Sequence, residues 1–455
     1  MSKVIKIRKG LDIKLMGKPE RSVSNALRAA AYGISPSDFV GITPKLLVQE
    51  GERVEAGTPV FFDKKRPELL VCSPVSGTVA AVNRGDKRSI INVVIEADKE
   101  QVYRQFEVPK LKTAERGEVI ASILEGGLWP CIMQRPYGII ANPDDTPKAV
   151  FVSGFDSAPL APDMNFALSA QMENLRTGFA VLRKLSGGEV HLGLRDGDEG
   201  ILEVLKPEGV QRHLFDGPHP AGNVGVQIAH IDPICKDDIV WTVDIQNVAM
   251  IGRFFNTGRL DMTKVYAVAG SEVAQPAYVS ALVGAPVASL LPEENRKQQK
   301  DGDSIRYISG NVLTGKRVGA DGYIGFYANQ LTALPEGDKY ELLGWAMPRF
   351  NKFSVARTYF SWLRPDKQYV IDTNINGGHR PFIVTGLFER YVPMDIYPMY
   401  LLKAILAGDI DKMENLGIYE VVEEDLALCE FVDPSKNEIQ QMVRDGINLM
   451  IKELS

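Results

Sequence analysis

The amino-acid sequence predicts a multidomain α/β protein with an all-β domain first, an α/β domain next and helices at the end. Residues 1 to about 100 read as short alternating strands separated by glycine and proline turns. Strand and helix patterns then follow one another up to residue 256, and beyond residue 330 the apolar residues recur at helical spacing. A length of 455 residues is typical of two to four domains.

The first block, residues 1–102, contains the pattern of a prosthetic-group carrier domain. From Gly51 a glycine-rich start leads into a hairpin, which closes on a Pro-x-x-Gly turn at Pro74. This layout is typical of lipoyl and biotinyl domains, in which a lysine at the hairpin tip is modified. Arg66 occupies that register here, and a guanidinium stays protonated and cannot be acylated as a lysine is. Lys64 and Lys65 are out of register, and a one-residue slip points a side chain to the opposite face. We therefore predict a barrel-sandwich domain without the carrier function.

The second block, residues 103–256, is predicted to be a Rossmann-like α/β domain. Apolar residues at helical spacing predict helices at 117–127 and 168–188, and short apolar runs predict strands at 148–154 and 189–194. The order strand, helix, strand within a short stretch defines a βαβ unit.

The third block, residues 257–330, is predicted to be a small β-grasp domain of the SLBB type, because two strand patterns precede a short helix. The segment Gly310–Arg317 nearly matches a phosphate-binding P-loop, but Arg317 replaces the required Ser or Thr. It is better interpreted as a glycine-rich turn. Residues 294–304 are predicted to form a polar loop.

The last block, residues 331–455, is predicted to be mostly helical. Its final helix is expected to open with a capping box from Ser435 to Glu438. The apolar residues that follow form one stripe, namely Ile439, Met442, Val443, Ile447, Met450, Ile451 and Leu454.

Composition excludes several classes of function. A formal net charge of −6 provides no global basic field for nucleic acid. The longest apolar run has 14 residues, 278–291, whereas a membrane span needs about 20. No secretory signal is visible. The four cysteines, 72, 131, 235 and 429, are scattered singly, without the paired spacing of zinc or iron–sulfur ligands. These features together predict a cytoplasmic protein.

The segment 126–138 is a candidate site for a flat ring such as a quinone or flavin. Trp129 and Tyr137 can stack on a ring, Arg135 can donate to its carbonyl, and Pro136 stiffens the loop. Ordinary packing at a domain edge is the alternative interpretation.

The segment 213–233 contains three of the five histidines, at 213, 219 and 230, in a spacing that fits no common zinc site. Its Gly/Pro run predicts a stiff loop able to hold a ligand or partner, through Asp216, Gly217, His219 and Pro220.

Several longer segments carry a resemblance that extends over the whole chain. They are SPVSGTVAAVNRGDKR, FDGPHPAGNVG, ISGNVLTG, GWAMPRFNKFSV and EEDLALCEFVDPSK. In these the sequence resembles the A-subunit of the sodium-translocating NADH:quinone reductases. That family is related to the C-subunit of the Rnf complex and to the flavin- and NADH-binding subunit of respiratory complex I.

The resemblance also shows where this chain departs from the flavoprotein relatives. They have a glycine-rich loop where this chain has Trp129 and Arg135, and glycine lets backbone approach a flavin phosphate closely. They also carry a cysteine-rich cluster motif where this chain keeps only Cys429. The resemblance therefore implies loss of NADH, FMN and iron–sulfur binding.

The resemblance implies a peripheral cytoplasmic protein that docks on membrane subunits, most directly the B-subunit. It also implies a contribution to the quinone-reducing end, with ubiquinone as ligand and no cofactor of its own. Three alternatives stay open: a soluble flavin-dependent NADH dehydrogenase, a purely structural scaffold, and a lipoyl-type carrier.

Overall fold

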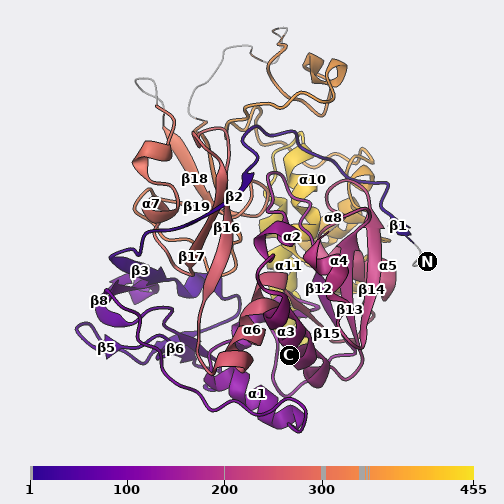
Figure 1. Ribbon diagram of the computed structural model, residues 1–455. Coiled ribbons are helices and arrows are strands. Elements are labelled where there is room, and N and C mark those ends of the chain that lie inside the picture. The colour runs from indigo at the N-terminus through magenta and orange to yellow at the C-terminus, as the bar shows by residue number, and fades with distance from the viewer. Residues whose placement is uncertain are drawn as a thin grey trace.

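The computed structural model describes residues 4–198, 200–298, 304–337, 344, 347 and 349–454. Residues 299–303 of the expected polar loop lie outside these ranges, as do residues 345, 346 and 348 of the segment GWAMPRFNKFSV. The described residues form four β-sheets. In Figure 1 the barrel-sandwich strands lie at the lower left, a six-stranded sheet lies above them, and the α/β unit lies to the right.

Two small antiparallel sheets form the barrel-sandwich domain. One has the order β3 (Ala31–Ile34), β9 (Ile90–Ala97), β8 (Gly77–Arg84) and β5 (Arg53–Val54), and the other β4 (Pro44–Leu46), β6 (Pro59–Asp63) and β7 (Leu70–Cys72). Alternation along the strands turns Val60, Val79 and Val93 into the core. Arg66, at the β6–β7 turn, bonds to Asp63 and to the carbonyls of residues 140 and 141 at 3.4 Å. The end of this hairpin therefore lies against the α/β unit.

The α/β unit is built on a seven-stranded sheet. Its order is β1 (Val4–Lys6), β14 (Val210–Asp216), β13 (Glu189–Arg195), β12 (Ala149–Ser153), β15 (Val240–Val243), β10 (Ile132–Arg135) and β11 (Ile139–Ile140). The strands from β1 to β15 pair in parallel, and β10 and β11 are antiparallel. Strand β12 reads Ala-Val-Phe-Val and is buried along these four residues, as expected for a sheet covered on both faces.

The helices of this unit pack closely on the sheet and on each other. They are α1 (Arg116–Glu125), α2 (Met164–Ala167), α3 (Met172–Leu185), α4 (Ile201–Leu205), α5 (Val224–Ile231) and α6 (Ile245–Thr257). The Asp244 carboxylate caps α6 by accepting from the N–H groups of Gln246 and Asn247. Helix α6 crosses α3 so closely that a Cβ at Gly252 would lie 1.8 Å from the carbonyl oxygen of Asn174. The predicted mixed α/β character is confirmed.

The six-stranded sheet has the order β19 (Lys316–Val318), β18 (Ile305–Ser309), β20 (Gln330–Pro335), β16 (Thr263–Ala269), β17 (Ala277–Leu282) and β2 (Glu20–Asn25), with helix α7 (Val287–Leu290) beside it. The near-P-loop segment connects the hairpin β18–β19, and the Asn311 side chain accepts from the N–H groups of Leu313 and Thr314. This confirms the interpretation of the segment as a turn.

The N-terminal segment 4–25 pairs with strands outside the barrel-sandwich domain. Val4 pairs with Leu214, Leu15 forms a bridge with Tyr369, and β2 lies parallel to β17. The predicted block 1–102 therefore contains two different parts, because its first strands are contributed to the other two sheets.

The C-terminal region has four α-helices beyond residue 397 within the described residues. They are α8 (Pro398–Ala407), α9 (Ile410–Asn415), α10 (Ala427–Val432) and α11 (Ile439–Leu454). The predicted capping box is wrong, because the Ser435 hydroxyl donates to the carbonyl of Pro381 and α11 begins only at Ile439. The Asp433 carboxylate accepts from the N–H groups of Ser435 and Asn437 instead. In the part of the chain that the structure describes, no helix has both the length and the apolarity needed to cross a membrane.

Candidate functional site

The predicted ring site around Trp129 is occupied by protein side chains. The Trp129 side chain is fully buried, and its ring contacts Trp241 edge-on with centroids 5.6 Å apart. Its indole N–H donates to the carbonyl of Ala141 at 2.8 Å, so its polar atom is satisfied. In this structure the ring of Trp129 has no free face for a ligand.

Arg135 is held in an ion-pair cluster with the C-terminal region, in which Arg135 and Asp425 are buried and the Glu424 side chain is 41% exposed. Its guanidinium donates to the carboxylates of Asp425 and Glu424, each at 2.6 Å. Arg135 and Asp425 are each 3% exposed. A forked guanidinium suits this arrangement, because it can bond two carboxylates at once. The charge predicted to meet a quinone carbonyl is therefore already neutralised by two acids about 290 residues further along the chain.

The other two residues of the predicted ring site face the same C-terminal region. Pro136 is buried, and the half-buried Tyr137 ring lies 6.3 Å from the ring of Tyr419. The backbone carbonyl of Tyr137 accepts a hydrogen bond from Arg444 at 2.9 Å. Trp129 and Tyr137 thus face different surroundings and do not form one open slot. Quinone binding at this loop stays a prediction.

The predicted partner loop, Asp216 to Pro220, holds the N-terminal segment of the same chain. The carbonyl of Asp216 accepts from the N–H of Ile7 at 2.7 Å, and the carbonyl of His219 accepts from the N–H of Leu11 at 2.8 Å. Gly217 has φ +151°, and a Cβ there would lie 2.2 Å from the carbonyl oxygen of Ile7. Glycine is therefore required for this close approach.

His219 lies at the centre of this contact. Its backbone N–H donates to the Asp12 carboxylate at 3.0 Å, and its Nδ1 lies 3.0 Å from the hydroxyl of Ser157. Burial lowers the pKa of His219 to about 4, although the Asp12 carboxylate opposes this shift. The histidine is therefore neutral at physiological pH and serves as a buried hydrogen-bonding group. Pro220, the next residue, is buried beside it.

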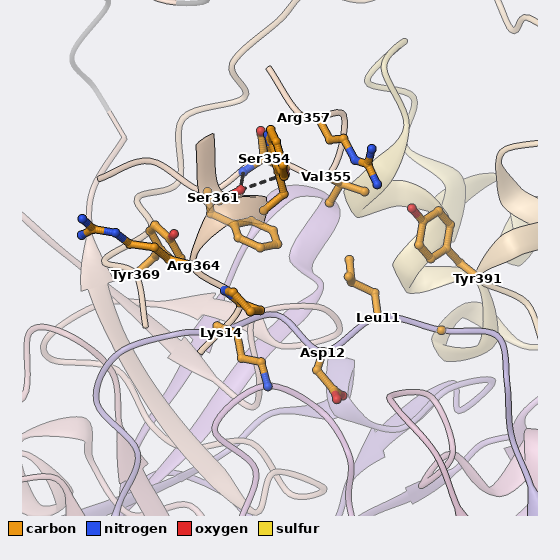
Figure 2. Close-up of a pocket in the computed structure, with 14 residues that line it drawn as sticks. Leu11, Asp12, Lys14, Ser354, Val355, Arg357, Ser361, Arg364, Tyr369 and Tyr391 are labelled. Carbon is orange, nitrogen blue, oxygen red and sulfur yellow. Dashed lines mark hydrogen bonds between the residues drawn. The ribbon is translucent and has the colours of Figure 1, made fainter. Parts of the chain in front are cut away.

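Next to the same N-terminal segment, the described residues line an open pocket of about 380 Å³ (Figure 2), a volume within the range of small-molecule sites. Its walls come from three parts of the chain, residues 10–14, residues 353–369 and Tyr391. Hydrogen bonds from the N–H of Gly10 to the carbonyl of Arg390, and from the N–H of Tyr369 to the carbonyl of Lys14, hold these parts together.

The pocket is lined by aromatic and basic side chains. Trp362 and Tyr391 contribute rings, and Arg357 and Arg364 lie on opposite sides of the opening in Figure 2. Tyr369 is 2% exposed, and its hydroxyl has no hydrogen-bond partner among the described residues. Sequence reasoning noted the segment GWAMPRFNKFSV only as a resemblance and missed this site. The clustering of aromatic and basic residues between 349 and 367 was the available signal.

Three domain families match this chain in order along the sequence. They are the NqrA N-terminal barrel-sandwich hybrid domain at residues 5–98, the NqrA second alpha/beta domain at 114–260 and the NQRA C-terminal domain at 265–320. With the sheets described above, they define a multidomain protein of the NqrA type.

Full-length relatives identify the family. The chain is 36% identical to the A-subunit proteins of the Na(+)-translocating NADH-quinone reductases of Histophilus somni (strain 2336) and of Neisseria meningitidis serogroup B, in each case over 99% of this chain and 100% of the relative. The corresponding protein of Serratia proteamaculans has the same identity and coverage. The chain therefore belongs to the A-subunit family of the Na(+)-translocating NADH-quinone reductases, and the predicted resemblance is confirmed.

Proposed function

We propose that this protein is a peripheral component of a Na+-translocating NADH:quinone reductase, bound at the cytoplasmic side of the membrane through other subunits. The membrane-embedded B-subunit is its most direct partner in this proposal. Identity of 36% over essentially the whole length of this chain and of its relatives is the observation that carries the proposal. A partner of this kind would bury more than about 1,000 Å² of surface.

We further propose that the chain itself holds no flavin, nicotinamide or iron–sulfur centre. The place of the flavoprotein glycine loop is filled by Trp129 and Arg135, whose polar atoms are bonded to protein. Three of the four cysteines are buried, and Cys235 is exposed. On this proposal, any contribution to ubiquinone reduction comes from shaping a quinone site within the assembled complex.

The test is purification of the complex from the native host through an affinity tag on this chain. We expect the other reductase subunits and NADH:quinone reductase activity to co-purify with the tag, and the separated chain to be colourless. A chain that purifies alone and oxidises NADH with bound flavin would instead support a soluble NADH dehydrogenase. If the chain co-purifies with the other subunits, but a complex prepared without it has unchanged reductase activity, the result would support a structural scaffold.

A further inference from the structure

Large apolar side chains are exposed on one projecting part of the molecule. We define the aromatic arm as residues 349–367, which Figure 1 shows in orange at the top of the view, away from the barrel-sandwich strands. On it Phe350, Trp362 and Leu363 are each more than half exposed, and Phe360 is 38% exposed. The rings of Phe350 and Phe360 stack on each other with centroids 5.2 Å apart. Several large apolar groups are thus brought together in water, as is typical of an interaction surface.

The charge of the arm is opposite to that of the whole chain. The arm contains five basic residues and one acidic residue, whereas the chain has a formal net charge of −6. The exposed Arg357 lies over the ring of Trp362 with its guanidinium carbon 5.8 Å from the centroid. Within the described part of the chain, neither Arg357 nor the exposed Arg364 forms an ion pair with a carboxylate. Arg357 and Arg364 therefore present positive charge without a carboxylate partner among the described residues, next to exposed rings.

The base of the arm is attached firmly to the body of the molecule. Tyr369, just beyond the arm, pairs with residues 14–16, and Phe353 packs between Tyr369 and Phe431. Within the arm, the hydroxyl of Ser361 donates to the carbonyl of Ser354, and the hydroxyl of Ser354 accepts from the N–H of Tyr359. These contacts hold the exposed side chains in place, which reduces the conformational entropy lost on binding.

We propose that the aromatic arm binds the surface of an anionic lipid bilayer. This rests on the proposed function, which puts the chain beside a membrane. Tryptophan prefers the boundary between headgroups and acyl chains, and arginine is attracted to anionic headgroups. A surface that combines both, without a helix able to span the bilayer among the described residues, is suited to lie on the membrane. The arm would then orient the protein while its partners supply most of the affinity.

The experiment measures co-sedimentation of the purified full-length chain with vesicles. One set contains phosphatidylglycerol and phosphatidylethanolamine, and a second contains phosphatidylcholine alone. Two double variants are compared with the wild type, Arg357→Gln with Arg364→Gln, and Phe360→Ser with Trp362→Ser. The matched controls are Arg88→Gln with Arg176→Gln, which removes two exposed arginines elsewhere, and Leu27→Ser, which removes a leucine that is 87% exposed.

We expect binding to the anionic vesicles only, and weaker binding at high salt because the attraction is screened. Loss of two arginines should lower the partition coefficient roughly 10- to 30-fold, at about fivefold per charge. The aromatic double variant should also bind less, and both controls should bind as the wild type does. Brominated lipids should quench the fluorescence of Trp362 in the wild type.

Equal binding by the arm variants and the wild type, or no binding to anionic vesicles, would overturn the proposal. If the arm variants instead fail to co-purify with the other subunits and no form of the chain binds vesicles, the arm is a protein-docking surface. Co-purification without vesicle binding leaves the proposed function intact and refutes the lipid contact alone. Failure to co-purify with the other subunits, combined with arm-dependent vesicle binding, would refute the proposed function and support the lipid contact.

Discussion

Replacement of Arg135 tests whether this residue stabilises the fold or serves a ligand. In Arg135→Met, the Asp425 carboxylate would keep the N–H of Val422 at 3.0 Å, but would lose its buried cation. Its other oxygen already has no partner among the described residues. An uncompensated charge at a side chain with no exposure costs about 3–5 kcal/mol of unfolding free energy. We therefore expect a loss of that size.

The assay is urea unfolding at pH 7.5, followed by tryptophan fluorescence, because Trp129 and Trp241 are buried in the same unit as Arg135. A second variant, Arg135→Met with Asp425→Asn, also removes the unpaired carboxylate of Asp425. It should regain at least about 1.5 kcal/mol of unfolding free energy relative to Arg135→Met. The control is Arg53→Met, which breaks an ion pair whose arginine side chain is 66% exposed and should cost less than about 1 kcal/mol.

The reasoning fails if Arg135→Met is no more destabilising than the control, or if the second variant recovers nothing. A ligand-binding role would give a different result, with weaker binding of a short-chain ubiquinone and unchanged urea stability. The two interpretations of Arg135 are therefore separated by one pair of measurements.

Three further predictions concern other groups in the structure. The pKa of His219 is about 4 in the folded protein, so this histidine stays neutral there between pH 7 and pH 4. In the unfolded chain the same histidine binds a proton below about pH 6.5. The free energy of unfolding should therefore fall as the pH falls from 7 towards 4. At pH 5 this loss is roughly 2 kcal/mol. It is measured by urea unfolding at pH 7 and pH 5, as the decrease in unfolding free energy of the wild type beyond that of His219→Gln. Gly217→Ala should lower the free energy of unfolding by more than about 2 kcal/mol, because the new Cβ would lie 2.2 Å from the carbonyl oxygen of Ile7. The shift should also weaken the neighbouring bond from the N–H of Ile7 to the carbonyl of Asp216 and speed hydrogen exchange at that N–H; unchanged exchange would contradict this. In a native thiol titration Cys235 alone should react quickly, since burial raises the pKa of Cys72 to about 12 and the other two thiols are also buried; rapid reaction of a second thiol would refute the described packing.

Local periodicity was enough to predict those elements whose burial depends on their own sequence. The stripe on the last helix is an example, because Ile439, Val443, Ile447 and Met450 are all fully buried. The start of that helix was misplaced because the Asp433 carboxylate bonds to the N–H groups of Ser435 and Asn437. Several side chains could accept these bonds, and the sequence pattern does not decide between them.

Contacts between distant segments could not be predicted in this way. The chemistry of Arg135 suggested a ligand, but its partners Glu424 and Asp425 lie about 290 residues away and carry no local signal. Alternation likewise identified the first strand, but not its pairing of Val4 with Leu214. The aromatic arm is different, because its basic and aromatic residues are visible in the sequence and only their exposure required the structure.

The pairing of Val4 with Leu214 has a consequence for synthesis of the protein. The first strand leaves the ribosome long before β14, β17 or Tyr369 exists to receive it. At about 5–20 residues per second, 210 residues take roughly 10–40 s to translate. During that time the barrel-sandwich strands can form their own sheets. The backbone N–H and C=O groups of the N-terminal segment 4–25 stay without their strand partners until those strands are made. Docking of this segment is thus a late step of biogenesis, and a fusion or tag placed before Val4 should act mainly on that step.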